Sequence, residues 1–293
     1  MSSQTIEPTS TDDALHPRTH CTVDADGRIS LVLPSGTAAD VPAPQLLLRL
    51  RPKKGQPEKT LRVLDLQRGD DGRLNGVLDV EPALPEGRWD LFLLTAGAGP
   101  DAPRHRLRPG MRDLRALVDG QSRQRHSPVA VRVPYATKDG FLAVRTWLRT
   151  AHAEVERMTA TDRSLTVRAR LHGARLTASA TVRLRPRGGD GAVRTLRAEP
   201  DGGGQGFWFT VDYGELVADG GGAAPRIWDA FVKVEDPDAV APVRIARLLD
   251  DVADRKGIFV YPEATVGGAT VRPYYTVDND LSVKVAPAAP RAM

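Results

Sequence analysis

Cysteine, lysine and aromatic residues are all scarce in this chain of 293 residues. Its one cysteine, Cys21, cannot form an internal disulfide, so nothing marks the chain as built for an oxidising compartment. Residues 1–7 have neither the cationic start nor the apolar core of a secretory signal, and no apolar run is long enough to cross a bilayer. We therefore expect a cytoplasmic protein without a transmembrane segment, which a partner could hold at the inner membrane face.

Motifs of catalytic and metal sites are missing as well. The six histidines show no zinc-ligand spacing such as His-Glu-x-x-His, and there is no Gly-x-Ser-x-Gly. The Gly-rich stretches at 202–204 and 220–222 are followed by neither Lys-Ser nor Lys-Thr, so a phosphate-cradling loop is not supported. The sequence thus predicts no catalytic residue, no metal and no cofactor.

Positive and negative charges nearly balance, because 41 Lys and Arg face 37 Asp and Glu, which leaves a net charge of +4 at pH 7. This excess is too small to predict binding to nucleic acid. Only seven of the 41 cations are lysine, and the other 34 (41 − 7) are arginine. Arginine suits bidentate contacts to phosphate or carboxylate, and a GC-rich genome is the alternative explanation of the bias.

What the chain does contain is an internal repeat. The sequence of segment 134–144 recurs at 273–283, where six of the eleven positions are identical. The Trp-Asp pair at 89–90 returns at 228–229 with the same displacement of 139 residues (273 − 134 and 228 − 89). Two blocks that share one offset predict a single module used twice.

The length suits two domains, each large enough to bury its own core. The first residues are Ser, Thr, Asp, Glu and Pro with almost nothing to bury, so they cannot offset the entropy of ordering. We expect a disordered N-terminal tail at 1–17, a first module at 18–149, a second module at 150–286 and a flexible C-terminal tail at 287–293.

Short alternating runs separated by Pro and Gly fill both modules, a pattern typical of antiparallel strands with one buried face. We predict an all-β protein of two tandem Ig-like antiparallel β-sandwich domains, with a short helical connection near 112–118. In the first module the expected strands are 28–33, 45–51, 60–66, 73–80, 88–95, 104–108, 129–135 and 141–147. In the second they are 153–158, 164–171, 178–185, 193–198, 207–213, 227–234, 243–248, 257–260, 270–275 and 281–285.

Two recurring groups are candidate anchors of the repeat. In a strand, the Trp and Asp side chains face opposite ways, so the Trp is either a core anchor or an exposed platform for a sugar ring. The Asp would accept a hydrogen bond from backbone or arginine, and the Tyr hydroxyl would bond back to the backbone as in the Ig tyrosine corner. These anchors are Trp89, Asp90, Tyr135, Thr137, Trp228, Asp229, Tyr274 and Thr276.

The most cationic segment runs from 104 to 125 and contains only two acids. It is either a solvated loop or a surface that binds an anionic polymer or a partner, and salt-sensitive binding would be the mark of the second. Its arginines are Arg104, Arg106, Arg108, Arg112, Arg115, Arg123 and Arg125.

The strand sequences at 164–171, 227–234, 243–248 and 272–283 together resemble the β-sandwich modules at the carboxyl end of Gram-positive and actinobacterial cell-wall glycosyltransferases and polyol-phosphate transferases of the teichoic-acid type. In that family the appended Ig-like part is implicated in oligomerisation and in handling polymer. The resemblance covers both modules. These 293 residues include no counterpart of the family's catalytic domain, so no catalytic residue is carried over.

We therefore expect a non-catalytic accessory protein of cell-wall glycopolymer or exopolysaccharide synthesis, which docks to a glycosyltransferase or holds its anionic polymer. Two alternatives stay open. One is a transferase acting on the same class of polymer, with its site between the two modules. The other is a purely structural protein that associates with itself into homo-oligomers.

Overall fold

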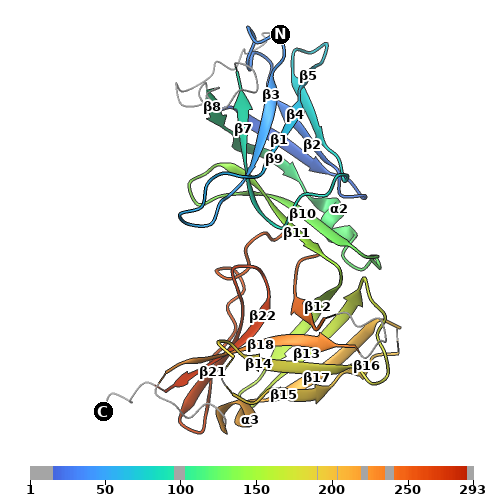
Figure 1. The fold of residues 1–293 in the computed structure, drawn as a ribbon, viewed down its shortest axis with the longest axis vertical. Helices are drawn as coiled ribbons and strands as arrows, with labels where there is room; N and C mark the ends of the chain where they lie inside the picture. Colours follow the sequence, from blue (N-terminus) through green and yellow to red (C-terminus); the bar gives the residue numbers. More distant parts are fainter. Residues whose placement is uncertain are drawn as a thin grey trace, which may run out of the picture. The chain divides into compact units, whose positions relative to one another are not determined.

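The structure is a computed structural model of the chain, and it describes residues 16–95, 103–189, 191–202, 204–218, 224–234 and 241–288 (Figure 1). About 51% of the residues lie in strands and 4% in helices, and the strands form several largely antiparallel sheets. The prediction of an all-β protein is therefore confirmed. The Ig-like identity of the sheets and their origin by duplication remain predictions.

Alternation of buried and solvent-facing residues explains why these segments become strands. In β1 (Arg18–Val23) and β6 (Leu74–Leu78), every second side chain is buried and those between are exposed. The same period of two runs through β13 (Ser164–His172) and β18 (Arg226–Lys233). Because successive side chains of a strand point to opposite faces, this pattern buries one face and leaves the other in water.

The chain forms two compact units. The first comprises Met1–Ser122 and Ala130–Leu148, and the second comprises Arg123–Val129 and Arg149–Met293. The segment Arg123–Val129 thus groups with the second unit, whereas the sequence placed it inside the 18–149 module. Compactness does not show that a unit folds alone, so the predicted limits of the two domains remain predictions.

The first unit contains two sheets. Besides β1 and β6, its strands are β2 (Ile29–Leu33), β3 (Gln45–Leu50), β4 (Leu61–Asp65), β5 (Gln67–Arg68), β7 (Gly87–Leu94), β8 (Arg104–Arg106), β9 (Arg108–Asp113), β10 (Val129–Ala136) and β11 (Leu142–Arg149). The strand orders are β5-β6-β2-β1-β9 and β10-β11-β7-β3-β4, and β8 pairs with β7. β1 and β9 run parallel to each other.

In its described residues, the second unit forms one continuous set of eleven paired strands. Besides β13 and β18, these are β12 (His152–Ala160), β14 (Thr181–Pro186), β15 (Arg194–Arg197), β16 (Glu199–Pro200), β17 (Gly206–Asp212), β19 (Val243–Ala246), β20 (Ala264–Val266), β21 (Ala269–Tyr275) and β22 (Leu281–Pro287). Their order is β16-β17-β13-β12-β19-β18-β22-β21-β20, with β14 on β18 and β15 on β14.

One short strand joins the two halves of this set. β19 pairs antiparallel with β18 on one side and parallel with β12 on the other. In the first unit, two consecutive strands make the pairings that β19 makes alone. β8 pairs antiparallel with β7, and β9 pairs parallel with β1. Only Leu107, which is fully buried, separates β8 from β9. The likeness of the two connections supports the predicted duplication without establishing it.

Two predictions of local structure were wrong. Residues 257–260 are not a strand, because the N–H groups of Ile258 and Phe259 both donate to the Arg255 carbonyl oxygen, at 3.0 and 2.9 Å, and close a turn. The helix predicted at 112–118 is shorter, because β9 extends to Asp113 and α2 spans only Arg115–Asp119. β1 and the helix α3 (Tyr213–Ala218) were not predicted.

The predicted tails lie mostly outside the described residues, which begin at 16 and end at 288. Within the described part, the Pro17 carbonyl oxygen accepts a hydrogen bond from the Arg108 N–H, and Pro287 still belongs to β22. The Ala288 N–H donates to the Gly268 carbonyl oxygen. None of the helices in the described ranges has the length and apolar character needed to span a bilayer.

Candidate binding sites

In the first unit, arginines surround the carboxylate of Asp90, which is only 3% exposed. Alternation along β7 puts Asp90 on the face opposite Trp89, whose indole is buried. Arg51 donates to Asp90 at 2.6 and 2.9 Å, Arg49 at 3.0 Å and Arg106 at 3.2 Å. Burial opposes ionisation of Asp90, but the bonds from Arg51 and Arg49 outweigh it and lower the pKa of Asp90.

A second carboxylate extends this Asp90 cluster. Glu58 accepts from Arg49 at 2.7 Å and from Arg104 at 2.9 Å. The Arg106 guanidinium lies 4.0 Å from the ring centroid of Phe141. The cluster therefore holds its arginines by ion pairs and ring stacking, so much of their charge is already matched.

The second unit contains a matching Asp229 cluster. Asp229 follows Trp228, whose side chain is fully buried, and its Oδ1 accepts from Arg187, Arg244 and Ser282, each at 2.7 Å. Burial again opposes ionisation, and the bonds from Arg187 and Ser282 lower the pKa of Asp229. Both Trp-Asp pairs thus place an indole in a core and a carboxylate among arginines. Neither indole is exposed to stack on a sugar.

The Tyr-Thr anchors shape two hairpin turns. Thr137 Oγ1 accepts from the Phe141 N–H at 3.1 Å, and Thr276 Oγ1 accepts from the Asp280 N–H at 3.2 Å. The hydroxyl of Tyr135 is buried and finds no hydrogen-bond partner among the described residues. The backbone bond of a tyrosine corner, expected for Tyr135, is therefore not observed.

The predicted arginine-rich segment is divided between different environments. Arg104 and Arg106 belong to the Asp90 cluster, and Arg108 lies 5.4 Å from the Phe141 ring centroid. Arg112 is exposed near the end of β9, and Arg115 pairs locally with Asp113 at 2.6 Å. Arg123 and Arg125 belong to the second unit.

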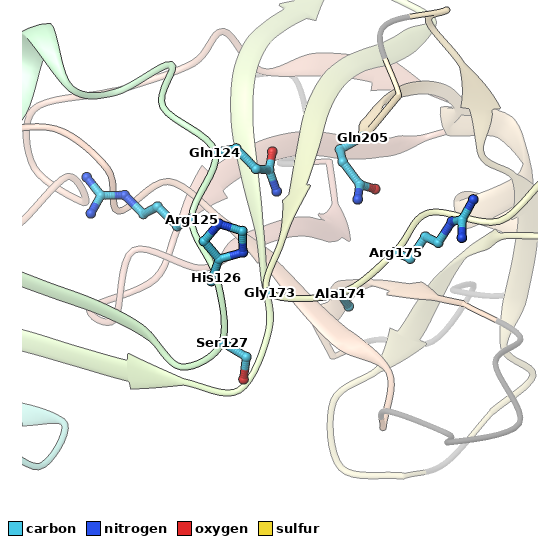
Figure 2. Close-up of a pocket in the computed structure, with 8 residues that line it drawn as sticks. All are labelled: Gln124, Arg125, His126, Ser127, Gly173, Ala174, Arg175 and Gln205. Atoms are coloured by element: carbon cyan, nitrogen blue, oxygen red, sulfur yellow. The ribbon is translucent and has the colours of Figure 1, made fainter.

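The segment that carries Arg125 borders a polar pocket of about 330 Å³ in the second unit (Figure 2). Figure 2 shows the Gln124 and Gln205 side chains between those of Arg125 and Arg175, which extend to opposite sides. Gln124 donates to the Leu171 carbonyl oxygen, and Gln205 accepts from the Leu176 N–H. Both amides are thus engaged with backbone. The pocket is lined by Gln124, Arg125, His126, Ser127, Gly173, Ala174, Arg175 and Gln205.

A buried polar network adjoins this segment. Glu154 accepts from His152 Nε2 at 2.7 Å and from the backbone N–H groups of residues 248 and 249 at 2.7 and 3.2 Å. His172 stacks on His152, and its Nδ1 accepts from the Arg125 N–H at 3.2 Å. Burial, followed by the proximity of His152, lowers the pKa of His172 to about 4. His172 is therefore neutral at physiological pH.

A second pocket, of about 350 Å³, combines positive charge with aromatic rings. It lies over β18, β22 and β21, where Ile227 is opposite Lys284 and Lys284 is opposite Arg272. Tyr274 is two residues beyond Arg272 on the same face. We call this the cation–aromatic pocket, and its lining residues are Ile227, Lys256, Phe259, Val260, Tyr261, Arg272, Pro273, Tyr274 and Lys284.

The charges of the cation–aromatic pocket are unmatched within the described residues. Lys256, Arg272 and Lys284 contribute three positive charges, and the lining contains no carboxylate. None of the three forms an ion pair with any described Asp or Glu. Phe259 and Tyr261 pack edge-on against the buried ring of Tyr275, with centroids 6.4 and 6.2 Å apart. The pocket thus presents fixed rings beside available cations, an arrangement suited to an anionic ligand with an apolar face.

Sequence reasoning missed this pocket, because its residues come from four separate segments. One signal could have pointed to it. The chain has only seven lysines, and two of them, Lys256 and Lys284, meet here. Metal chemistry has no comparable signal, since the described part of the chain holds no group of three or more His, Cys, Asp or Glu placed to bind a metal ion.

Comparison with protein-family models finds no match, and comparison with curated proteins finds none. Among solved structures, TarS of S. aureus matches with a TM-score of 0.38 and 11% identity, over 58% of this chain and 31% of that chain. A structure of TarS 217–571 matches with a TM-score of 0.39 and 11% identity, over 71% and 46%. A marsupial T cell receptor matches with a TM-score of 0.23 and 7% identity, over 92% of both chains. This chain spans less than half of either TarS chain, and the structural resemblance is distant.

Proposed function

We propose that this chain is a non-catalytic accessory protein that binds an anionic glycopolymer of the cell-wall type, so that a glycosyltransferase can act on it. The cation–aromatic pocket carries the proposal, because three cations with no carboxylate line it beside fixed aromatic rings. The sequence resemblance to modules appended to cell-wall transferases suggests the class of polymer. Repeating phosphate groups joined by sugars or polyols offer both the charge and the apolar surface that such a pocket fits.

Each part of the pocket has a role in this proposal. Arg272 offers a planar guanidinium that can bind two phosphate oxygens at once, and Lys256 and Lys284 act as point charges beside it. Tyr261 and Tyr274 supply ring surface for the sugar or polyol between phosphates. The pocket volume of about 350 Å³ is of the size that holds a small ligand, here about one repeating unit of the polymer.

The test is retention of purified poly(glycerol phosphate) on the immobilised full chain. We expect binding at low salt that weakens by about tenfold or more at 0.5 M salt, since surface charges are screened within about 4 Å at this concentration. The double variant Arg272→Glu with Lys284→Glu should abolish retention, because it replaces two attractive charges by repulsive ones.

The matched control is Lys138→Glu, which reverses an exposed charge in the first unit. It should retain the polymer as the unaltered chain does. Equal retention by the double variant and the control would contradict the proposed site. Failure of the unaltered chain to retain any polymer at low salt would contradict the function.

A further inference from the structure

Trp208 differs from every other aromatic residue in the described part of the chain. Its side chain is 43% exposed, whereas Trp89, Trp147 and Trp228 are at most 1% exposed. It lies on β17 between two buried phenylalanines, at 207 and 209, so strand alternation directs the indole to the outer face of the sheet. A large aromatic ring therefore lies open on a strand whose inner face is fully packed.

Polar side chains flank this indole in a regular order. Trp208 pairs across the ladder with Arg168 of β13 on one side and Glu199 of β16 on the other. In the next row on the same face, Thr166 and Thr210 are opposite each other, and their hydroxyl oxygens are 2.9 Å apart. The outer face of β13 and β17 thus offers hydroxyl, guanidinium and carboxylate groups around one open ring.

The charges of this face are matched, unlike those of the cation–aromatic pocket. Arg168 is 2.9 Å from Asp201 and 3.4 Å from Glu156, and Arg170 is 2.7 Å from Glu156. Two guanidinium groups therefore face two carboxylates. A face with balanced charges gives an anionic ligand no net attraction, but its paired groups still offer donors and acceptors to hydroxyl groups.

A pyranose ring has the complementary chemistry. One face of the ring presents C–H groups, which pack on the flat surface of an indole, and its rim carries hydroxyl groups that both donate and accept hydrogen bonds. Carboxylates accept from such hydroxyls and guanidinium groups donate to them. An uncharged sugar ring would therefore use every group that surrounds Trp208.

We propose that the outer face of β13 and β17 binds a neutral sugar ring stacked on Trp208, with Arg168 and the Thr166–Thr210 pair contacting its hydroxyl groups. This goes beyond the proposed function, because the ligand is uncharged and the site shares no residue with the cation–aromatic pocket. The two sites would let one glycopolymer be held both by its sugars and by its charged groups.

The test is titration of the full chain with maltohexaose, cellohexaose and the hexamer of N-acetylglucosamine, followed by tryptophan fluorescence and by calorimetry. We expect at least one of these sugars to shift the emission of the exposed indole and to release heat. Trp208→Ala should weaken binding by tenfold or more, and Trp208→Phe, which keeps a ring, should weaken it less and abolish the emission change. Both variants should remain folded, because the indole lies on the outer face of the sheet, and Trp208→Phe should melt close to the unaltered chain.

The double variant Arg272→Glu with Lys284→Glu serves as the control, and it should bind the neutral sugar unchanged. Loss of sugar binding in this variant, or equal binding by Trp208→Ala, would overturn the assignment of the site. So would the absence of any response to all three sugars at about 10 mM. Concentration-dependent self-association that Trp208→Ala removes would also overturn it, because the face would then bind a second copy.

Discussion

At the scale of single residues, the carboxylates of Asp90 and Asp229 each accept hydrogen bonds from arginines of separate segments. A carboxylate taken out of water is costly unless it is paired, and here several guanidinium groups pair it at once. These two residues are therefore internal counter-ions for the arginines around them. We propose that they stabilise their units.

Removing the Asp90 carboxylate should cost stability. Asp90→Ala removes the carboxylate that Arg49, Arg51 and Arg106 share and, among the described residues, leaves only Arg49 paired, with Glu58; because these arginines are partly exposed we expect a loss of about 2 to 3 kcal/mol. Urea unfolding would measure it. The control is Asp70→Ala, at an exposed position, which should change the free energy of unfolding by less than about 0.5 kcal/mol. Equal effects of the two variants would refute the counter-ion role.

His172 should make stability depend on pH. Its folded pKa of about 4 lies below the ordinary value of 6.5, so the unfolded chain binds the proton more readily. The neutral side chain contributes its full stability above pH 6.5, and this contribution falls as the pH drops toward 4, by roughly 3 kcal/mol in total. Unfolding midpoints at pH 7.5 and 4.5 should differ less for His172→Gln, whose amide can still accept from Arg125. An unchanged pH dependence in that variant would be evidence against this assignment.

At the scale of elements, the turn between β21 and β22 depends on Asn279. This residue has a φ of 61°, in the left-handed region, and the equivalent turn of the first unit has Gly140 with a φ of 77°. The fully buried side chain of Asn279 also accepts from the Arg255 N–H at 3.0 Å and donates to the Val252 carbonyl oxygen at 3.1 Å. The turn thus fixes the segment that leads into the cation–aromatic pocket.

Asn279→Ala should therefore be more harmful than Asn279→Gly. Alanine adds left-handed strain to the lost hydrogen bonds, for a cost of about 3 to 4 kcal/mol, whereas glycine loses mainly the hydrogen bonds, for about 2 kcal/mol. Thermal or urea unfolding of both variants would measure the difference. If alanine were tolerated as well as glycine, backbone strain would not be what selects the residue at this turn.

The positions of the strands are the part of the fold that the sequence predicted best. Strand alternation is local, so segments such as 45–51 and 281–285 were placed within two residues of β3 and β22. Partners across a sheet are not local. The row of Ile227, Lys284 and Arg272 depends on β18 pairing with β22, although Ile227 and Lys284 are 57 residues apart (284 − 227). No pattern within one strand predicts that pairing.

The same distinction applies to the segment 104–125, whose role in binding remains a prediction. The sequence marks it because its arginines lie close together along the chain. The carboxylates of Glu58 and Asp90, which neutralise Arg104 and Arg106, come from distant segments and could not be assigned without the fold. Conversely, the cations of the cation–aromatic pocket, which have no ion-pair partner in the described part of the chain, are spread over three segments, where no local excess of charge marks them.

At the scale of the whole molecule, the chain has two compact units, and the continuous apolar core of the second runs from Ala151 to Val285 without a residue of the first. Units with separate cores can unfold in separate steps. The cation–aromatic pocket and the Trp208 face both belong to the second unit, whereas the Asp90 cluster belongs to the first.

Calorimetry of the full chain should accordingly show two transitions. Asp90→Ala should lower the temperature of one transition, and Asn279→Ala should lower that of the other, because each change weakens only its own unit. A shift of one common transition by both variants would show that the units unfold together. The unaltered chain under the same buffer conditions provides the reference.

β19 has a mechanical consequence. β19 is paired in parallel on one side and antiparallel on the other, so the two halves of the second unit can separate at this strand only if one of the two ladders breaks. In the proposed function, this doubly paired strand would help to keep both halves of the second unit together when a bound polymer is pulled.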